Sequence, residues 1–424
     1  MRALTEVVEQ PAAEQTDGLW VKTGASGKSA PVWSPIAWSQ LVRTVDYVSH
    51  WTEALLGPTA EGETVLYMGL SDVQYPIMAL AALNTWYTIY LALSRNPQNV
   101  QDHFLDSITC IEFIHTSELA AQMQALTMHH SELDPLQTGA IFQHEPASTP
   151  YDHFCLLQEG YVVLILHSSD PTSLPKLIVI RTGALATMDT VTFMSAPSGR
   201  RNMHDEPFAP KLIVLPMPFF HIVIITAQAR SIYHQGSVAL LSPGQPAMAD
   251  FLTRAIKQNE PSAATLAPPV LEETRYFPSG LEILPMLGDV FHSDAPLAYS
   301  RGDRIAQVTN LQPHIGNTEI TNAPNYVAEE TGDWEYIEHS ADADTDMEPA
   351  TVPSFEMVIP DEHQSAGIEA PTGLEAIKGI VKTALRTCLG SSDREYTDDD
   401  GIYIGGFDSL RVLALSNIVL SLFL

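Results

Sequence analysis

The sequence predicts an α/β fold with a mostly parallel sheet, followed by a small all-α unit at the C-terminus. Three observations lead to this prediction. Over most of the 424-residue chain, apolar runs rich in β-branched residues alternate with segments of helical periodicity. Hydrophobic residues make up 45% of the chain, which is enough for a sizeable core. Beyond residue 372 the pattern changes to an amphipathic helix, an acidic loop and a second, apolar helix.

The individual elements follow from apolar spacing and from turn residues. We expect a hairpin at 20–33, an amphipathic helix at 39–56, buried strands at 64–68, 108–115 and 161–166, and a helix at 117–128. The apolar run 75–93 has nearly the length of a membrane span, but Pro76 opens it and Asn84 interrupts it. We interpret it as a buried helix and a buried strand, and a membrane span is the alternative. Residues 258–270, rich in Pro, Ala and Ser, predict a loop.

Charge and cysteine content exclude several classes of protein. A net charge of −30 and a pI near 4.6 argue against nucleic acid or an anionic membrane as partner. The three cysteines lie far apart, so the sequence predicts neither a disulfide framework nor a zinc site. The first residues lack the apolar segment of a secretory signal. We therefore expect a cytoplasmic protein.

The C-terminal helical unit contains a serine in an exposed position. Residues 405–410 read Gly-Gly-Phe-Asp-Ser-Leu, in which the glycines permit a sharp turn and Asp408 can cap the helix that follows. Ser409 then lies in the first turn of that helix, where it is available for modification. Upstream, residues 372–375 have the Thr-x-x-Glu form of a capping box. The alternative is an ordinary helix N-terminus with an Asp-Ser cap.

A second candidate site follows the apolar strand 161–166. The loop after it contains Ser168, Ser169 and Thr172 and ends near Lys176. Backbone amides, hydroxyls and one ammonium group can together bind a nucleotide phosphate. A plain polar loop is the alternative interpretation.

Several of these stretches resemble, in the same order, the motifs of the adenylate-forming (AMP-binding) superfamily. Residues 168–176 are similar to its phosphate loop, 215–221 to its Pro-x-Phe-His segment, and 314–319 to its Tyr-Gly-x-Thr-Glu motif. The Asp-Trp-Glu-Tyr run at 333–336 and the Ser-Arg-Asn at 94–96 resemble fungal nonribosomal-peptide-synthetase-like proteins. Residues 405–410 resemble the attachment motif of the phosphopantetheine carrier domain that accompanies them.

The resemblance implies a role for each matching residue. Lys176, with Ser168, Ser169 and Thr172, would bind the phosphates of ATP. His221 would form part of the wall of the acyl pocket. Thr318 would contact phosphate and Glu319 would help to hold Mg²⁺. Ser409 would carry 4′-phosphopantetheine.

The same resemblance predicts an adenylation (AMP-binding)-like domain at 15–345, a linker at 346–371 and a partial carrier domain at 372–424. Such a protein would be an adenylate-forming ligase that activates a carboxylic acid with ATP and loads it as a thioester at Ser409, in secondary metabolism. Its partners would be a phosphopantetheinyl transferase, a small carboxylic acid and separate downstream synthetase or reductase domains.

Two departures from the family pattern support an alternative. Asp170 and Ser173 replace the glycines of the phosphate loop, and residues 358–372 leave no room for the small C-terminal subdomain that supplies the family's catalytic lysine. The alternative is therefore a relative without adenylation activity that acts only as a carrier or binding module.

Overall fold

The chain divides into two compact units in the computed structural model, Met1–His167 with Leu177–Ser340, and Ser168–Lys176 with Ala341–Leu424. The structure describes residues 2, 4–14, 17–25, 32–59, 62–93, 98–119, 130–132, 149–151, 160–168, 176–190, 196–202, 211–241, 249–274, 280–293, 297–314, 316, 318, 321, 325–328, 334–339, 346–349 and 355–358.

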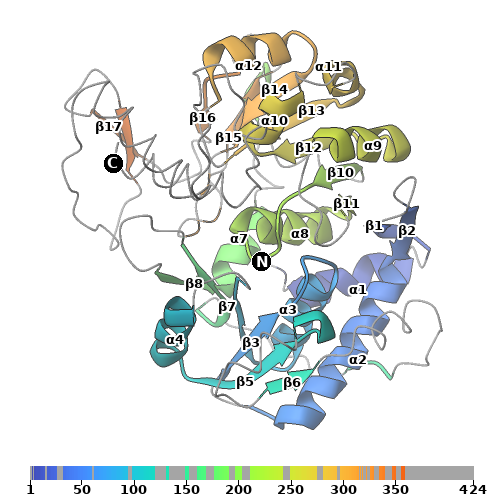
Figure 1. The fold of residues 1–424 in the computed structure, drawn as a ribbon, viewed down its shortest axis with the longest axis vertical. Helices are drawn as coiled ribbons and strands as arrows, with labels where there is room; N and C mark the ends of the chain where they lie inside the picture. Colours follow the sequence, from blue (N-terminus) through green and yellow to red (C-terminus); the bar gives the residue numbers. More distant parts are fainter. Residues whose placement is uncertain are drawn as a thin grey trace, which may run out of the picture. The chain divides into compact units, whose positions relative to one another are not determined.

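A seven-stranded sheet of order β14-β13-β12-β10-β11-β1-β2 forms one half of the first unit (Figure 1). Its strands are β1 (Leu19–Ala25), β2 (Val32–Ala37), β10 (Leu212–Leu215), β11 (Ser237–Leu240), β12 (Ala263–Leu266), β13 (Asp289–His292) and β14 (Asn310–Pro313). The pairs from β14 to β1 are parallel, and β1 pairs antiparallel with β2. The predicted hairpin at 20–33 is therefore confirmed.

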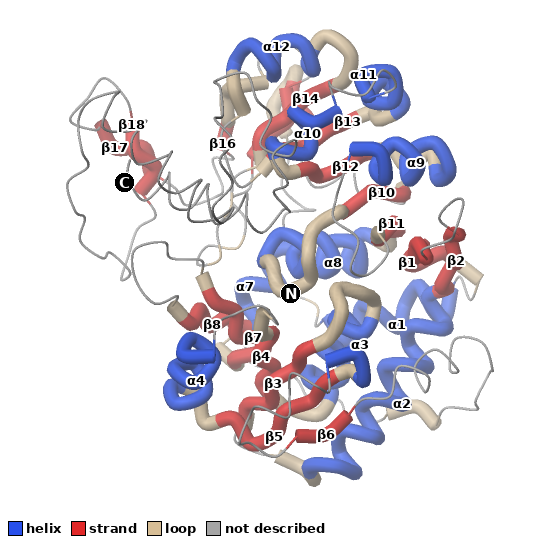
Figure 2. The backbone as a smooth tube through the Cα atoms, in the orientation of Figure 1, coloured by secondary structure: helices blue, strands red, loops and turns tan. Residues whose placement is uncertain are grey.

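The second large sheet has six strands in the order β6-β5-β3-β4-β7-β8 (Figure 2). They are β3 (Thr64–Met68), β4 (Thr88–Leu91), β5 (Cys110–His115), β6 (His130–Glu132), β7 (Val162–His167) and β8 (Leu177–Arg181). Only the β7–β8 pair is antiparallel. The prediction of an α/β fold with mostly parallel strands is confirmed, and so are the strands expected at 64–68, 108–115 and 161–166.

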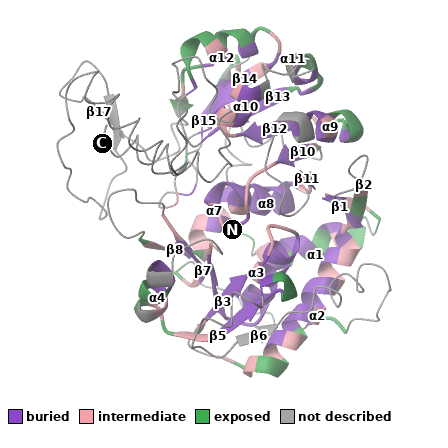
Figure 3. Ribbon diagram, viewed as in Figure 1, coloured by how far each residue is buried: buried purple, intermediate pink, exposed green. Residues whose placement is uncertain are grey.

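Helices cover both faces of the two sheets, as parallel sheets require. Between the sheets lie α2 (Trp38–Leu56), α3 (Gln74–Asn84) and α8 (Ile222–His234), with α1 (Leu4–Glu14) and α7 (Thr182–Thr190) packed beside them. Figure 3 shows α3 and α8 buried along their length. The outer layers contain α4 (Gln98–Ser107) on one side, and α9 (Ala249–Asn259), α10 (Pro268–Thr274), α11 (Gly280–Ile283) and α12 (Tyr299–Ala306) on the other.

Shorter elements complete the first unit. A three-stranded sheet joins β9 (Arg200–Asn202), β15 (Asn325–Ala328) and β16 (Glu338–His339), and short 3-10 helices lie at Ser117–Leu119 and Leu284–Met286. The predicted helix at 117–128 begins with the first of these, and the rest of it falls outside the described residues.

The apolar run 75–93 forms α3 and β4, as its sequence predicts. Asn84 is the last residue of the helix, and β4 is buried at every position because both faces of its sheet are covered. No helix within the described ranges is both long and apolar enough to cross a membrane.

The prediction of a loop over 258–270 is wrong. This stretch contains the end of α9, the start of α10 and, between them, β12, which pairs with both β10 and β13. Ala263 and Ala264 have little intrinsic strand preference, but their small side chains are fully packed in the sheet interior. Tertiary packing decides the structure here against local propensity.

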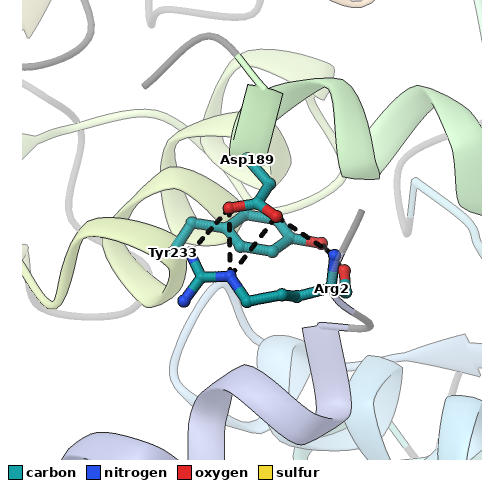
Figure 4. A network of polar contacts seen from close by, with 3 residues as sticks. All are labelled: Arg2, Asp189 and Tyr233. Carbon is teal, nitrogen blue, oxygen red and sulfur yellow. Dashed lines mark hydrogen bonds and ion pairs between the residues drawn. The ribbon is translucent and has the colours of Figure 1, made fainter. Parts of the chain in front are cut away.

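A cluster of Arg2, Asp189 and Tyr233 joins the N-terminus to α7 and α8 (Figure 4). The guanidinium of Arg2 donates to Asp189 Oδ1 at 2.6 Å, and the backbone N of Arg2 donates to Oδ2 at 3.1 Å. The Tyr233 hydroxyl donates to the Arg2 carbonyl at 3.2 Å. Burial opposes ionisation of Asp189, but its hydrogen bonds with Arg2 bring the net pKa of the carboxyl below its usual value.

The second compact unit contains an antiparallel hairpin of β17 (Asp346–Pro349) and β18 (Phe355–Val358). The two helices predicted within 372–424, with Ser409, lie outside the described residues. The carrier domain therefore stays a prediction.

Candidate active site

The carboxyl ends of four parallel strands meet along one edge of the seven-stranded sheet. β10, β12, β13 and β14 are successive neighbours in the same direction. Open α/β sheets bind ligands at this edge, where loops leave the strands. Two of the predicted motifs, at 215–221 and at 314–319, begin where β10 and β14 end.

His292 and Ser293 are buried polar residues at the end of β13. Neither His292 Nε2 nor Ser293 Oγ has a hydrogen-bond partner among the residues that the structure describes. Burial lowers the pKa of His292 to about 4, so its imidazole is neutral at physiological pH. A buried polar atom without a partner is costly, and a polar ligand at this edge would satisfy both atoms.

Trp334 packs against this end of β13. Its ring lies 6.1 Å from that of His292, centroid to centroid, and its Nε1 donates to Asp303 of α12 at 3.1 Å. The Trp of the Asp-Trp-Glu-Tyr motif is thus 4% exposed and supports the strand end. Sequence reasoning assigned no packing role to this tryptophan and did not select His292 or Ser293, which belong to none of the motifs described above.

The Tyr-Gly-x-Thr-Glu-like motif begins directly after β14. The backbone N of His314 donates to the carbonyl of His292 at 2.8 Å, and its ring meets Phe291 edge-on at 6.5 Å. Thr318 is half-buried in a turn four residues farther on, and Glu319 lies outside the described residues. The fold therefore brings the start of this motif next to His292, while the metal-binding role predicted for Glu319 stays a prediction.

His221 lies on the loop from β10 to α8, at the N-cap position of the helix, with extended backbone. Its Nδ1 has no hydrogen-bond partner within the described ranges. The positive end of the α8 dipole lies at the same place, which favours negative charge there. His221 thus lies at the same sheet edge as His292, and its predicted place in the wall of the acyl pocket stays a prediction.

The loop before His221 is fixed by residues that follow β3. The backbone N of Phe219 donates to Ser71 Oγ at 2.9 Å, and the Phe219 ring stacks on Tyr75 at 5.8 Å and 12°. Asp72 is the next residue after Ser71. Burial raises the pKa of its carboxyl to about 7, and the nearby charge of Glu118 acts in the same direction. Sequence reasoning missed this carboxyl, which titrates near neutral pH.

The predicted phosphate loop is closed by two hydrogen bonds at its base. The backbone N of Ser168 donates to the Lys176 carbonyl at 2.9 Å, and the backbone N of Lys176 donates to Ser168 Oγ at 3.3 Å. The Lys176 side chain is exposed, and the two residues belong to the second compact unit. Ser169 and Thr172 lie outside the described residues.

A resident metal ion would need several ligating side chains close together. No cluster of three or more His, Cys, Asp or Glu side chains that could hold an ion occurs in the part of the chain that the structure describes. The unpartnered atoms of His221, His292 and Ser293 are donors and acceptors suited to a polar organic ligand rather than a dedicated ion cage. They fit the polar groups of a nucleotide.

Known proteins share this architecture. The N-terminal domain of FACL13 from Mycobacterium tuberculosis aligns with a TM-score of 0.66 and 13% identity, covering 84% of this chain and 86% of that one. The N-terminal subdomain of NpsA from Klebsiella oxytoca aligns with a TM-score of 0.61 and 13% identity, covering 78% of each chain. An artificially fused adenylation–PCP di-domain containing NpsA aligns at 0.61 and 12% identity, covering 78% of this chain and 60% of that one. The chain therefore shares the fold of these N-terminal domains.

Sequence comparison points to the same group of proteins. The chain is 24% identical over 353 residues to a carboxylic acid reductase of Neurospora crassa, and the match covers 80% of this chain. It is homologous to that reductase but spans about a third of its length, since the match covers 33% of it. No protein-family model matches the chain. The shared fold confirms the predicted α/β architecture, and the homology agrees with the predicted relation to nonribosomal-peptide-synthetase-like proteins.

Proton uptake by buried histidines gives a prediction for stability. Burial lowers the pKa of both His292 and His234 to about 4, and for His234 the charge of Arg230 adds to the effect. The unfolded chain, with a histidine pKa near 6.5, binds these protons more readily between about pH 6.5 and 4. The stability that the two neutral histidines contribute is therefore fully present above pH 6.5. It decreases as the pH falls, by about 1–2 kcal/mol per histidine at pH 5.

Urea unfolding at several pH values measures this dependence. We expect the pH dependence of His292→Gln to lack the contribution of this imidazole, which lowers stability by about 1–2 kcal/mol between pH 7 and pH 5. His50→Gln, at an exposed histidine, is the matched control for the loss of an imidazole. An unaltered slope in His292→Gln would show that this imidazole is not buried in its neutral form. Asp72 acts in the opposite direction between about pH 4 and 7, because its raised pKa means that the folded protein keeps a proton which the unfolded chain releases in this range.

Proposed function

We propose that this chain is a nonribosomal-peptide-synthetase-like adenylation–carrier protein. It activates a small carboxylic acid with ATP and Mg²⁺ and loads the acyl group as a thioester on 4′-phosphopantetheine at Ser409. The observation that carries the adenylation step is the set of buried, unpartnered polar atoms of His221, His292 and Ser293 at the ligand-binding edge of an adenylate-forming fold. One of the solved structures with this fold is the NpsA N-terminal subdomain in complex with anthranilyl-AMSN. It aligns with this chain at a TM-score of 0.62 and 12% identity.

In the first step a carboxylate oxygen attacks the α-phosphorus of ATP, an acyl-adenylate forms and pyrophosphate leaves. Lys176 and Thr318 would bind phosphate oxygens, and the N-terminus of α8 would favour the developing negative charge. Glu319 would hold Mg²⁺, which neutralises phosphate charge when bound. His221 would orient the acyl group. In the second step a thiol attacks the acyl carbonyl and AMP leaves.

The reaction requires further proteins. A phosphopantetheinyl transferase would modify Ser409, and separate synthetase or reductase domains would consume the thioester. The Neurospora relative is named a carboxylic acid reductase, and its greater length is consistent with such additional domains.

ATP–pyrophosphate exchange across a panel of aliphatic and aromatic carboxylic acids tests the adenylation step. Exchange with at least one acid is expected. Lys176→Ala should reduce it by about 10²-fold, the typical effect of losing one charge-stabilising donor, whereas Lys211→Ala should leave it unchanged. Lys211 is an exposed lysine at the amino end of β10 and provides the matched control. Absence of exchange in a folded protein would contradict adenylation and favour the carrier or binding module.

Intact mass after incubation with coenzyme A, a broad-specificity phosphopantetheinyl transferase and Mg²⁺ tests the carrier step separately. A gain of one phosphopantetheine is expected in the wild type and in Ser416→Ala. The gain should be absent from Ser409→Ala. An unmodified wild type would contradict the carrier assignment, whatever the result of the exchange assay.

A further inference from the structure

An apolar cavity lies between α8 and the six-stranded sheet. It is lined by Leu80 and Leu83 of α3, Ile89 of β4, Leu164 of β7 and the ring of Phe219, among other apolar side chains. Its free volume is about 40 Å³. One water needs about 10–15 Å³ on this scale, so the space takes about three waters or a short chain of a few carbon atoms.

One side chain in the lining is polar. Gln228 of α8 is 4% exposed, and neither its Nε2 nor its Oε1 has a hydrogen-bond partner among the described residues. Glutamine offers two donors and an acceptor, and buried amides are nearly always hydrogen-bonded in folded proteins. An amide with both ends unpaired among the described residues, beside an apolar space, is suited to pair with a polar group of a molecule bound there.

The cavity is distinct from the candidate active site. Gln228, Ala229 and Ile232 lie three, four and seven residues after Ile225, so these residues share one face of α8, and this face contacts the cavity. The candidate active site instead lies at the carboxyl edge of the seven-stranded sheet, at the start of the helix. Phe219 is the link between them, because its ring lines the cavity two residues before His221.

The residues that line the cavity indicate which kind of ligand it can bind. All lining residues other than Gln228 are apolar, and none carries a charge that could pair with an ion. A charged ligand would lose its hydration without compensation. We propose that this cavity binds a short, neutral aliphatic molecule with one carboxamide or hydroxyl group, which pairs with the Gln228 amide while its carbon chain contacts Leu80, Leu83 and Leu164. This inference does not depend on the proposed adenylation activity.

Methyl-detected NMR of isoleucine-labelled protein tests the proposal with two probes, propionamide and xenon. Propionamide should shift the methyl signals of Ile89, Ile225 and Ile232, which line the cavity. Xenon, which needs only apolar space, should shift the same signals. Sodium propionate, of similar size but charged, should not shift them.

Two variants distinguish the contribution of the Gln228 amide to binding from that of the apolar cavity. Gln228→Met keeps the length of the side chain, and it should weaken propionamide binding at least tenfold while xenon binding persists. Ala229→Leu fills the cavity and should abolish both. Gln10→Met, an exposed glutamine on α1 that bonds to Glu14, is the matched control and should change neither.

Several outcomes would overturn the proposal. Equal affinity of Gln228→Met for propionamide would show that the amide does not bind the ligand. Failure of propionamide to shift the signals, with or without a response to xenon, would leave no polar ligand site. Gln228→Met should also unfold at a higher temperature than the wild type in the absence of ligand. A lower midpoint would mean that Gln228 is already satisfied in the folded protein.

Discussion

Replacing Gly302 by alanine is expected to destabilise the protein by about 3 kcal/mol, the cost of severe overpacking in a core. Gly302 is buried in α12, and a Cβ added there would overlap the six-membered ring of Trp334. In a helix without such an obstruction, replacing glycine by alanine stabilises the protein by about 1 kcal/mol. The contact with Trp334 therefore turns a normally stabilising change into a destabilising one. Because Trp334 also contacts His292, its displacement should disturb the end of β13.

Chemical unfolding monitored by circular dichroism measures the effect. Gly160→Ala is the control, since nothing lies within 4 Å of a Cβ added at that position. The double variant Gly302→Ala/Trp334→Leu should be less destabilised than the sum of its two single variants, because the smaller side chain removes the overlap. If Gly302→Ala unfolds with the wild-type midpoint, that result would contradict the close contact between Trp334 and α12.

Removal of the Arg201 side chain is the second change for which we expect a large effect. Arg201 of β9 makes two hydrogen bonds to Asp289 at the start of β13, with N–O distances of 2.6 and 3.3 Å. The side chains of Arg201 and Asp289 are 21% and 10% exposed, respectively. Arg201→Met would leave the carboxylate with Asn310, whose Nδ2 donates at 2.7 Å. Breaking a largely buried pair from one side costs about 3 kcal/mol.

The neighbouring arginine is the matched control. Arg200 pairs with Glu338, and their side chains are 36% and 49% exposed. Arg200→Met should therefore cost less than about 1 kcal/mol, as exposed ion pairs do. Adding Asp289→Asn to Arg201→Met should restore part of the stability, because it removes the unpaired charge. Equal effects of Arg200→Met and Arg201→Met in denaturant unfolding would contradict the difference in burial.

The sequence predicts much of the fold where hydrophobic period and turn residues agree. The helix expected at 39–56 is observed as Trp38–Leu56, and the strand expected at 64–68 has the same bounds in the structure. The run 75–93 was divided correctly because Asn84 and the β-branched residues after it mark the change from helix to strand. These elements have strong local signals.

The remaining elements depend on contacts that no local pattern contains. β12 was missed because Ala263 and Ala264 acquire their strand conformation from β10 and β13 on either side. The polar end of β13 was missed for a similar reason, since His292 becomes unusual only when burial and Trp334 surround it. Motif resemblance did identify the loops of His221 and Thr318, which follow strands of the same sheet edge.

The two large sheets also set an order of events during synthesis. The six-stranded sheet is built from one continuous stretch, from β3 to β8, whereas the seven-stranded sheet combines β1 and β2 with strands that follow β8. Val21 pairs with Val238, about two hundred residues later. At roughly 5–20 residues per second, a ribosome needs some 10–40 s to make that interval. The edge of β1 that pairs with β11 therefore stays unpaired until β11 has been synthesised. The six-stranded sheet, which is encoded between these two strands, can assemble first. A nascent chain that stalls in this interval exposes the free edge of β1 to aggregation.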